Sequence, residues 1–451
     1  MGRLFGTDGA RGVANTELTP ELAMKIGRAA AMVLIEENEN KHPKVLIGAD
    51  TRLSGDMLES ALAAGLCSVG ADVLTLGVIP TPAVAYLVKH YGYDAGIMIS
   101  ASHNPFEYNG IKIFKRDGFK LPDAVEEEIE AIILDEVRIP PVKVGAEVGR
   151  ITHYAETAHR DYINHLLATT EYRFNEMRVA IDCANGAAST TAKKLFEYLG
   201  CTTLVLAAEP DGLNINDNCG STHVENLQKF VRENECTVGF AFDGDADRLI
   251  AVDEHGDVVD GDKIIAICAK DMKEKGTLQS DTVVVTVMSN MGFFKFAEEE
   301  GIHCEKTKVG DRYVLENMLE NGYTIGGEQS GHVIFLDYAT TGDGELSAIQ
   351  VLKAMKRSGK SLSQLASCME VYPQVLINVK VSNIGKVRLP EDKEVWHAVE
   401  EAEKELGDTG RVLVRVSGTE PLVRVMLEGK DTEQIERLGN EIAEVVRERL
   451  I

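Results

Sequence analysis

Three aspartates alternate along one short loop of this chain, at Asp243, Asp245 and Asp247. The loop joins two apolar runs, Val238–Phe242 and Leu249–Val252, which are typical of buried strands. Carboxylates this close together repel one another, and a bound cation holds them together at the lowest cost. Mg²⁺ suits a set of three acids, because it takes few protein oxygens and completes its shell with water or phosphate. The spacing therefore predicts a magnesium loop.

Two other interpretations of this loop stay open from the sequence. A calcium-binding EF-hand loop also spaces acids in this way, and Glu254 falls at its twelfth position. That loop requires glycine at its sixth position, where Arg248 stands, and it lies between helices rather than strands. An ordinary polar turn between strands is the simplest alternative, because acidic residues are common in turns.

A serine follows another apolar run in the same manner. The strand-like segment Ala95–Ile99 leads directly into Ser-Ala-Ser-His-Asn-Pro at residues 100–105. Small neighbours and the Asn-Pro turn place the hydroxyl of Ser102 where it can reach a ligand, although serines are also common turn formers and helix caps. The loop lacks the G-x-S-x-G elbow of hydrolases, which leaves acyl transfer without support. A phosphate on Ser102, beside three aspartates and Mg²⁺, would instead form a phosphoryl-transfer centre.

A third loop carries groups that suit a sugar. Gly-Gly-Glu-Gln-Ser-Gly-His at residues 326–332 follows the strand-like run 323–325. Glu328, Ser330 and His332 offer an acid, a hydroxyl and an imidazole on a flexible backbone, which fit the hydroxyl or amino groups of a sugar. An ordinary turn with a surface histidine is the alternative.

A hairpin near the C-terminus carries two arginines. The run Arg411–Val416 alternates as a half-buried strand, and a Ser-Gly-Thr-Glu-Pro turn at residues 417–421 leads into the run 422–426. Two guanidinium groups, two hydroxyls and the backbone of a glycine turn are the components of a phosphate dianion site. Strand arginines also occur commonly on solvated faces. The predicted phosphate-binding residues are Arg415, Ser417, Gly418, Thr419 and Arg424.

Five motifs in this chain resemble, in type and order, those of the α-D-phosphohexomutase superfamily. They are Leu-Phe-Gly-Thr-Asp-Gly-Ala-Arg-Gly at residues 4–12, the serine loop, the aspartate loop, Gly-Glu-Gln-Ser-Gly-His at 327–332 and Arg-Val-Ser-Gly-Thr-Glu-Pro at 415–421. The chain is similar to the phosphoglucosamine mutase branch over essentially all of its 451 residues. The opening motif and Gln329 resemble that branch more than the phosphomannomutase/phosphoglucomutase branch.

The resemblance implies an α/β fold of four domains around a central cleft, with three similar α/β lobes and a smaller C-terminal α+β domain. Alternating runs support this class, because the strand-like runs 44–48 and 71–74 flank a helical segment at 57–66. An amphipathic helix at 432–450 is expected to pack on the last domain. The expected domains are 1–152 with the phosphoserine loop, 153–252 with the magnesium loop, 253–370 with the sugar-binding loop and 371–451 with the phosphate-binding hairpin.

The resemblance also implies a reaction. The enzyme is expected to interconvert glucosamine 6-phosphate and glucosamine 1-phosphate, which supplies UDP-N-acetylglucosamine and cell-wall synthesis. An enzyme phosphate on Ser102 would pass to one sugar oxygen, and the other phosphate of the resulting bisphosphate would return to Ser102 after the intermediate turns over. Glucosamine 1,6-bisphosphate, or glucose 1,6-bisphosphate, is the expected intermediate and activator. Mg²⁺ is the expected metal, held by the three aspartates and the phosphorylated serine.

The family's motifs imply roles for further residues. Arg11 and Arg248 are expected to meet the charge of the transferring phosphoryl group. Lys112 and His332 are the expected proton-transfer residues, although Lys112 on the strand-like run 111–114 also fits an ordinary surface lysine. The residues expected to bind the substrate are Glu328, Ser330 and Lys308, together with the hairpin residues Arg415, Ser417, Gly418, Thr419 and Arg424.

Composition narrows the possible partners. A net charge of −25 argues against nucleic acid or an anionic membrane surface as a partner. The eight cysteines show no C-x-x-C spacing, so they are expected to be reduced core residues of a cytoplasmic protein. Neither a signal peptide nor a membrane-spanning segment is expected from the apolar runs. The expected partner is a small hexosamine phosphate, and the expected state is a monomer or a homodimer.

Three other functions stay open from the sequence. A phosphomannomutase/phosphoglucomutase is the nearest, because it belongs to the same superfamily. A metal-dependent sugar phosphatase would share the acids and the serine, but it would release phosphate to water. A non-catalytic sugar-phosphate-binding protein would need only the glycine and arginine loops, which would leave the aspartate loop without a purpose.

Overall fold

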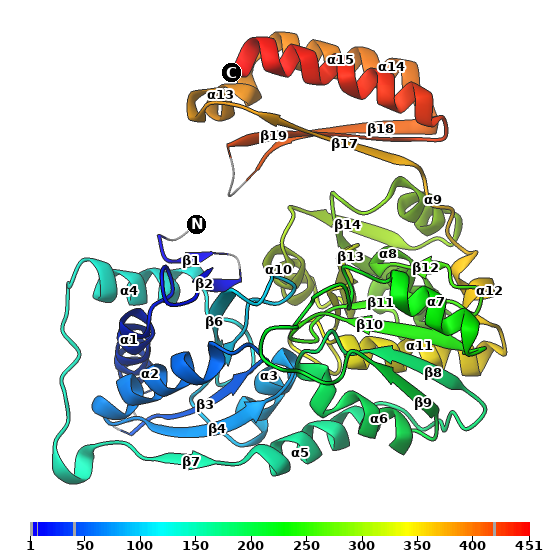
Figure 1. Cartoon of the computed structure of the whole chain (residues 1–451). Coiled ribbons are helices and arrows are strands. Elements are labelled where there is room, and N and C mark those ends of the chain that lie inside the picture. Colours follow the sequence, from blue (N-terminus) through cyan, green and yellow to red (C-terminus); the bar gives the residue numbers. More distant parts are fainter. Residues whose placement is uncertain (1–2, 7, 39–41, 418–420) are drawn as a thin grey trace. The chain divides into compact units, whose positions relative to one another are not determined.

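The chain folds into two compact units in the computed structural model, which describes residues 3–6, 8–38, 42–417 and 421–451. One unit comprises residues 1–288 and 301–368, and the other comprises residues 289–300 and 369–451. Within the described residues, four β-sheets and the helices that flank them build these units (Figure 1). The α/β class predicted from the sequence is confirmed.

The first sheet positions the serine loop. Its seven described strands lie in the order β1-β2-β6-β5-β3-β4-β7, and β3 runs parallel to both β4 and β5. β5 is buried along its whole length, as its unbroken apolar sequence predicts for a strand covered on both faces. The strands are β1 (Phe5–Gly6), β2 (Gly9–Val13), β3 (Lys44–Ala49), β4 (Asp72–Val78), β5 (Ala95–Ile99), β6 (Tyr108–Lys115) and β7 (Ile151–His153).

Helices cover both faces of this sheet. α1 (Pro20–Asn38), α2 (Gly55–Ser68) and α4 (Asp123–Leu134) share one apolar core with the sheet. α3 (Thr81–His90) packs against β3 and β5 from the other side. Gly96 of β5 lets α3 approach closely, because a Cβ atom there would lie 2.9 Å from the side chain of Val84.

The second sheet positions the aspartate loop. Its five described strands lie in the order β12-β11-β10-β8-β9, with β8 and β10 parallel and β10 and β11 antiparallel. The connection between β10 and β11 is the aspartate loop itself. The strands are β8 (Arg178–Asp182), β9 (Thr202–Leu206), β10 (Val238–Phe242), β11 (Leu249–Val252) and β12 (Val258–Val259), and the helices are α5 (Ala155–Leu167), α6 (Ala192–Tyr198) and α7 (Glu225–Glu233).

The third sheet positions the sugar loop. Its described strands, in the order β14-β13-β15-β16, are β13 (Thr282–Thr286), β14 (His303–Thr307), β15 (Ile325–Gly327) and β16 (Val333–Phe335), and its helices are α8 (Gly261–Glu274), α10 (Asp311–Asn321), α11 (Gly344–Ser358) and α12 (Leu362–Ala366). β15 begins at Ile325 and extends through Gly326 and Gly327, whereas the sequence predicted a strand that ends at Ile325. A Cβ atom on Gly326 would lie 2.7 Å from both the carbonyl oxygen of Val284 and the Sδ of Met318. The glycine therefore allows β15 to pack closely against β13 and α10.

The smaller unit carries the arginine hairpin. Its described strands lie in the order β17-β19-β18 and are antiparallel. α15 buries Ile435, Leu438, Ile442 and Val446 in the core of this unit, which confirms the predicted amphipathic helix. The elements are α9 (Met291–Glu299), β17 (Gln374–Lys380), α13 (Asn383–Arg388), α14 (Lys393–Leu406), β18 (Gly410–Val416), β19 (Leu422–Gly429) and α15 (Thr432–Leu450).

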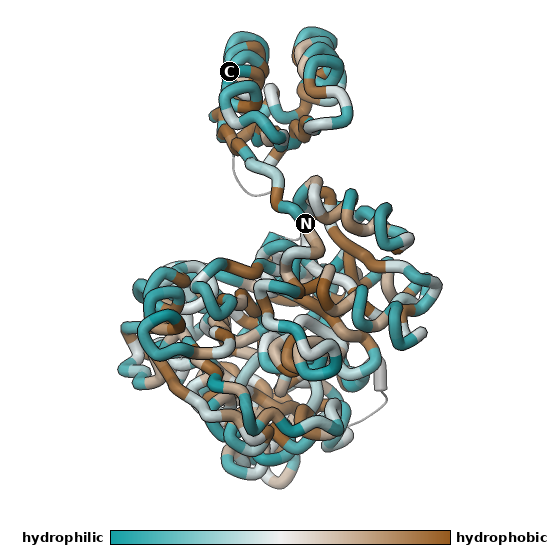
Figure 2. The backbone as a smooth tube through the Cα atoms, turned by 90° about the vertical axis from the view of Figure 1, so that its right-hand side faces the viewer, coloured by the Kyte–Doolittle hydropathy of each residue, from teal (hydrophilic) through white to brown (hydrophobic). Residues whose placement is uncertain are grey.

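Burial follows the hydropathy of the sequence. Figure 2 shows apolar segments gathered inside the larger unit and hydrophilic segments along its outer helices. All eight cysteines are free thiols; six of them are buried and two are half-buried. Among the described residues, no helix combines the length and the apolar composition that a membrane span needs. The predicted domain boundaries stay a prediction, since the residues 151–153 pair with β4 and the residues 289–300 group with the C-terminal unit.

Candidate functional site

The aspartate loop is a buried turn. Asp243 and Asp245 have no exposed surface, and Asp247 is 3% exposed. Pairing of β10 and β11 forces the chain to reverse here, and Ala246 adopts a left-handed backbone with a φ of 57° within the turn. The flanking strands exclude an EF-hand, whose loop lies between helices. Burial of all three carboxylates excludes an ordinary polar surface turn.

The serine loop meets the aspartate loop directly. Ser102 is 1% exposed, and its Oγ donates a hydrogen bond to Asp243 Oδ2 over 2.6 Å. Glycine is required at position 244, because a Cβ atom on Gly244 would lie 2.5 Å from the carbonyl oxygen of Ser102. The first and second sheets thus bring together the serine and the acids that the sequence singled out.

The three carboxylates fit a divalent cation. One oxygen of each lies within 4.8 Å of the others. Asp245 Oδ1 and Asp247 Oδ1 are buried without a hydrogen-bond partner among the described residues, which is unfavourable unless another ligand satisfies them. Burial raises the pKa of Asp243 well above its usual range, and the charges of Asp247 and Asp245 raise it further. A set of carboxylate oxygens is the donor set that Mg²⁺ prefers.

Lys112 is buried among carboxylates, so the alternative of a surface lysine is wrong. It lies on β6 and is 1% exposed. Its Nζ lies 2.7 Å from Asp245 Oδ2, 3.1 Å from Asp8 Oδ2 and 3.5 Å from Asp247 Oδ2. Burial alone lowers the pKa of Lys112, but these carboxylates outweigh it and raise the pKa above its ordinary value. Lys112 is therefore a protonated hydrogen-bond donor at neutral pH.

His332 is also buried, at 3% exposed, so it is not a surface histidine in an ordinary turn. Its Nδ1 lies 3.6 Å from Asp247 Oδ2, and its Nε2 lies 3.6 Å from Asp311 Oδ2. The backbone N–H of Gly342 donates to Nε2 over 3.1 Å. Burial lowers the pKa of His332, but Asp247 and Asp311 outweigh it and raise the pKa above its ordinary value. The third sheet therefore adds an imidazole to the serine and the acids.

Two arginines border the serine. Arg11 pairs with Asp8, and Arg248 Nη1 lies 3.1 Å from Nδ1 of His103, which lies 3.4 Å from Ser102 Oγ. The Nε atoms of both arginines are buried without a hydrogen-bond partner among the described residues. Burial, together with the charges of Arg248 and Arg11, lowers the pKa of His103 to about 4, so its imidazole is neutral at pH 7. Unpaired guanidinium donors beside a serine suit the oxygens of a phosphoryl group.

The sugar loop is held by the N-cap residues of α10 and α8. Glu328 Oε1 accepts a hydrogen bond from the backbone N–H of Gly310 over 3.1 Å. Gln329 Nε2 donates to Asp260 Oδ2 over 3.2 Å, next to the first turn of α8. Ser330 is exposed, and so is Lys308, whose Nζ lies 5.9 Å from the centre of the Tyr313 ring. The structure therefore places Glu328 beside the segment that carries Lys308.

The arginine hairpin forms as expected in the smaller unit. Arg415 of β18 and Arg424 of β19 are directly opposed in the strand register. Burial lowers the pKa of Arg415, and the neighbouring charge of Arg424 lowers it further. Ser417 is 2% exposed, and its backbone N–H donates to the carbonyl oxygen of Leu422. The predicted residues Gly418 and Thr419 lie outside the described residues.

Several residues that support the site were not singled out from the sequence. Thr81 donates from Oγ1 to Asp245 Oδ2 over 2.6 Å, and from its backbone N–H to the carbonyl oxygen of Asp245 over 2.9 Å. Lys120 bridges Asp8 Oδ1 and Asp311 Oδ2 at 2.6 Å each. Thr81 follows β4 and begins a helix, and this position at a strand end was a usable signal. Lys120 and Asp311 meet only through the packing of the first sheet on the third, so no local pattern marks them.

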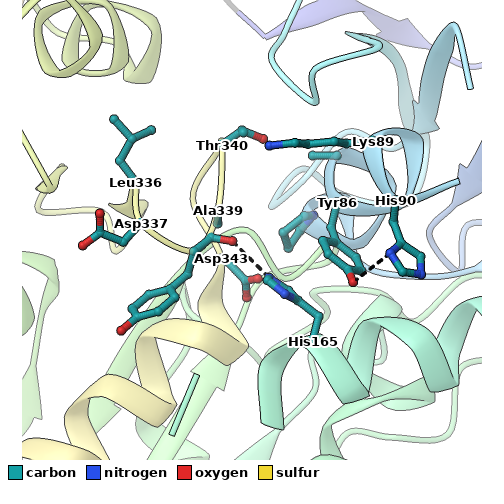
Figure 3. A pocket seen from close by; sticks show the side chains of 12 residues that line it. Tyr86, Lys89, His90, His165, Leu336, Asp337, Ala339, Thr340 and Asp343 are labelled. Carbon is teal, nitrogen blue, oxygen red and sulfur yellow. Dashed lines mark hydrogen bonds between the residues drawn. The ribbon is translucent and has the colours of Figure 1, made fainter. Parts of the chain in front are cut away.

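A separate cavity of about 460 Å³ lies among α3, α5 and the segment before α11 (Figure 3). The rings of Tyr86 and His165 stack in its wall with centres 4.0 Å apart. His165 Nε2 lies 3.0 Å from the carbonyl oxygen of Tyr338, and Figure 3 draws this contact together with the one between Tyr86 and His90. No residue that the sequence predicted for the site is among the described residues that line this cavity. The cavity and the acidic site are therefore distinct features.

A serine hydroxyl bonded to one of three buried carboxylates, with arginines beside it, on repeated α/β sheets, defines a phosphoryl-transfer enzyme whose carboxylates could hold a metal. Four family profiles match the chain: phosphoglucomutase/phosphomannomutase alpha/beta/alpha domain I at residues 2–138, domain II at 160–256, domain III at 260–372 and the C-terminal domain at 376–445. The chain therefore belongs to the phosphoglucomutase/phosphomannomutase family of phosphohexomutases.

Individual relatives match over the whole length. Phosphoglucosamine mutase of Thermoanaerobacter pseudethanolicus is 57% identical over 450 residues, which is 100% of both chains. The solved structure of a phosphoglucomutase/phosphomannomutase family protein from Burkholderia thailandensis matches with a TM-score of 0.83 at 24% identity, over 100% of this chain and 99% of that one. Aspergillus fumigatus N-acetylphosphoglucosamine mutase in complex with GlcNAc-6P and magnesium matches with a TM-score of 0.69 at 16% identity, over 100% and 96%. The two solved structures share the fold of this chain.

Proposed function

We propose that this chain interconverts glucosamine 6-phosphate and glucosamine 1-phosphate, which is the activity of a phosphoglucosamine mutase. The observation that carries the proposal is the 2.6 Å hydrogen bond from Ser102 Oγ to Asp243, within a cluster of three buried carboxylates. In this proposal the bond would join a phosphate acceptor to a metal site, as phosphoryl transfer requires. The relative that is 57% identical and bears this name supports the choice of sugar. The product would supply UDP-N-acetylglucosamine and cell-wall synthesis.

Ser102 carries the phosphate in this proposal. The oxygen of a sugar hydroxyl attacks phosphorus, the bond between phosphorus and Ser102 Oγ breaks, and the hydroxyl proton passes to a basic group of the site. Lys112 and His332 are the groups proposed to exchange protons with the sugar and serine oxygens, and Lys112, which is protonated at neutral pH, would begin as a proton donor. Arg11 and Arg248 offer guanidinium N–H groups to the charge on the phosphoryl oxygens.

The aspartate loop is the proposed magnesium site. Asp243, Asp245 and Asp247 would hold Mg²⁺ together with an oxygen of phosphorylated Ser102. Bound there, the metal supplies positive charge that stabilises the transferring phosphoryl group. The unpartnered oxygens of Asp245 and Asp247 support this assignment. The magnesium in the complex of the Aspergillus fumigatus relative supports it as well.

A bisphosphate links the two halves of the reaction. The two sugar oxygens lie far apart, so phosphate cannot move between them within one bound pose. The proposed intermediate is glucosamine 1,6-bisphosphate, which turns over before Ser102 takes back the second phosphate, and glucose 1,6-bisphosphate would also phosphorylate the enzyme. The residues proposed to bind the sugar are Glu328, Ser330 and Lys308, and those proposed to bind the phosphate that is not reacting are Arg415, Ser417, Gly418, Thr419 and Arg424.

We also propose that the chain is divided into four domains. The matched family profiles leave gaps at residues 139–159, 257–259 and 373–375, which support a division into four domains near the expected boundaries of 152, 252 and 370. We also propose a cytoplasmic location, a monomeric or homodimeric state, and no nucleic-acid or membrane partner, in keeping with the net charge of −25.

Turnover of glucosamine, glucose and mannose 6-phosphates side by side, with released phosphate measured, tests the function. We expect the fastest conversion with glucosamine 6-phosphate, a requirement for Mg²⁺ and no accumulation of free phosphate. A clear preference for mannose or glucose would instead support a phosphomannomutase/phosphoglucomutase. Release of one phosphate for each sugar consumed would indicate a phosphatase. Binding of these sugar phosphates without turnover of any of them would indicate a non-catalytic sugar-phosphate-binding protein.

A further inference from the structure

Ser102 has a strained backbone that its neighbours hold in place. Its φ of 54° lies in the left-handed region, which residues other than glycine rarely adopt and which persists only where the surroundings fix it. Its backbone N–H donates to Ser100 Oγ over 2.9 Å, and Ser100 Oγ donates to Asp50 Oδ2 over 2.6 Å. The carbonyl oxygen of Ser102 accepts two hydrogen bonds of 2.9 Å, one from Arg52 Nη2 and one from Asn216 Nδ2.

Arg52 directs both of its Nη groups at the carbonyl oxygens of this loop and of the start of β6. Its Nη2 also donates to the carbonyl oxygen of Asn104 over 2.8 Å, and its Nη1 donates to those of Pro105 and Tyr108, the latter over 3.0 Å. Its Nε donates to Asp50 Oδ2 over 2.9 Å, in an ion pair whose two side chains have no exposed surface. A planar fork of donors can serve several carbonyl groups at fixed angles, which the point charge of a lysine cannot do.

Asn216 reaches the same loop from the side of the second sheet. Its Nδ2 donates to the carbonyl oxygen of Ser102 and, over 3.0 Å, to that of Asn104. A further bond joins the two sides beside it, because the backbone N–H of Leu53 donates to the carbonyl oxygen of Gly212, in the loop that carries Asn216, over 2.9 Å. The segment that carries Arg52 and the loop that carries Asn216 are therefore fastened to each other as well as to Ser102.

We propose that Arg52 and Asn216 are positioning residues for phosphoryl transfer, which together fix the backbone of Ser102 so that its Oγ points at the aspartate loop. This inference rests on the proposed role of Ser102 as the phosphate carrier. Both residues act on the carbonyl oxygen of Ser102, behind its reactive oxygen. They should therefore govern how fast phosphate leaves Oγ, and not how tightly the sugar binds.

The hydrogen bonds from Arg52 and Asn216 to the carbonyl oxygen of Ser102 form a clamp on its backbone. Arg52→Lys tests the first half of this clamp, because lysine keeps a positive charge for Asp50 but loses the planar set of guanidinium donors. The enzyme is phosphorylated with glucose 1,6-bisphosphate, the occupancy of Ser102 is measured by intact-protein mass spectrometry, and single-turnover transfer to glucosamine 6-phosphate is followed by rapid quench. We expect a transfer rate constant per phosphorylated molecule about tenfold or more below that of the wild type, with a half-saturating sugar concentration within about twofold. Arg160→Lys, at a side chain that is 64% exposed, is the matched control and should transfer at the wild-type rate.

Asn216→Asp tests the second half and does not depend on whether Arg52→Lys folds. The change keeps the shape of the side chain but turns a donor towards Ser102 and Asn104 into an acceptor, which repels both carbonyl groups. Asparagine and aspartate both tolerate the left-handed backbone found at this position, where φ is 58°. Asn218→Asp is the matched control, because it lies in the same loop with a φ of 52° and is exposed.

Each outcome decides one point. Slower transfer in both variants, with sugar binding and both controls unchanged, supports the clamp. Transfer at the wild-type rate per phosphorylated molecule would overturn it, even if the variants melt at a lower temperature, because the contacts would then only stabilise the fold. A change confined to the half-saturating sugar concentration would overturn it too. Absence of phosphate on Ser102 in the wild type would refute the proposed function itself, so the two failures are distinguishable.

Discussion

Lys112 and Asp245 form an ion pair with almost no exposed surface, in which Nζ and Oδ2 lie 2.7 Å apart. Lys112 belongs to the first sheet and Asp245 to the aspartate loop of the second, so the pair connects the two sheets at the site. A buried ion pair adds little net stability, because desolvation of the two charges offsets their attraction. Its main effect here is geometric: it fixes where Asp245 lies relative to the strand that carries Lys112.

The pair adjoins a closed ring in which basic and acidic side chains alternate. Lys120 and Asp311 extend the contacts to the third sheet, and His332 returns them to the aspartate loop. Three different sheets contribute to the ring, so it can form only when all three are correctly packed. In order around the ring, the members are Lys112, Asp8, Lys120, Asp311, His332 and Asp247.

Ser102→Ala should abolish enzyme phosphorylation. The hydroxyl of Ser102 donates to Asp243, and alanine has no side-chain oxygen that could bond to phosphorus. Intact-protein mass spectrometry after incubation with glucose 1,6-bisphosphate should show one added phosphate in the wild type and none in the variant. Ser60→Ala, at an exposed serine of α2, should label like the wild type. Labelling that persists in Ser102→Ala would remove Ser102 from the carrier role.

Asp245→Asn should weaken Mg²⁺ binding and slow turnover together. The change removes one negative charge and nearly keeps the shape, and Mg²⁺ affinity should fall by roughly 10–100-fold or more, since loss of an outer-shell partner alone costs that much. Calorimetric titration with Mg²⁺ and activity at limiting Mg²⁺ measure the two effects. Thr81→Val, which removes one hydrogen bond to Asp245, should show a smaller loss of the same kind. Full activity of the wild type with excess chelator would contradict the metal assignment.

Continuous apolar runs made the strands of the site predictable. The expected spans Ala95–Ile99, Val238–Phe242 and Leu249–Val252 coincide with β5, β10 and β11, because each run is bounded by polar turn residues. The helix at 432–450 was predictable for the same reason, from its 3.6-residue pattern. β15 was predicted less well, because Gly326 and Gly327 normally signal a loop and are tolerated in this strand only by its close packing.

The site was predictable where its residues lie in local motifs, and not where they meet through packing. Ser102 and Asp243 each follow the carboxyl end of a strand, where open α/β sheets bind ligands, so a position at a ligand site was a reasonable expectation for both. The clamp on Ser102 depends on Arg52, which lies 50 residues earlier in the chain, and the contact of Lys120 with Asp311 spans 191 residues. No spacing rule connects such pairs. Burial of Lys112 was likewise invisible, because its strand alternates as a surface strand would.

Asp343 should make the stability of the fold depend on pH. Its carboxyl accepts hydrogen bonds from the backbone N–H of Leu346 and from the hydroxyl of Tyr162, and burial raises its pKa to about 7. The folded state therefore keeps a proton that the unfolded state loses above about pH 4, so the free energy of unfolding should fall as pH rises from about 4 to about 7. Asp343→Asn removes this dependence, which is worth about 4 kcal/mol at most.

Thermal unfolding of the wild type and Asp343→Asn between about pH 4.5 and pH 7.5 measures the difference. The melting temperature of the variant should decline less with rising pH than that of the wild type. Asp337→Asn is the control, because Asp337 is exposed in the same connecting segment and should leave the pH profile unchanged. Parallel profiles for the wild type and Asp343→Asn would show that Asp343 is ionised in the folded state throughout this range.

Arg415→Ala should separate a mutase from a phosphatase. Arg415 and Arg424 face each other across the hairpin and are proposed to hold the phosphate that is not reacting, in both orientations of the bisphosphate. Loss of one charge-assisted donor should cost about 1.5–3 kcal/mol, or roughly one to two orders of magnitude in binding. Binding of glucosamine 6-phosphate and of the bisphosphate should weaken alike, while Mg²⁺ binding stays unchanged.

Arg415→Ala should also need more added bisphosphate, because weaker binding of the distal phosphate lets the intermediate escape before it has turned over. Arg437→Ala, at an exposed position of α15, is the control. Normal binding of both sugars by Arg415→Ala would make the hairpin a structural element and place the phosphate site elsewhere.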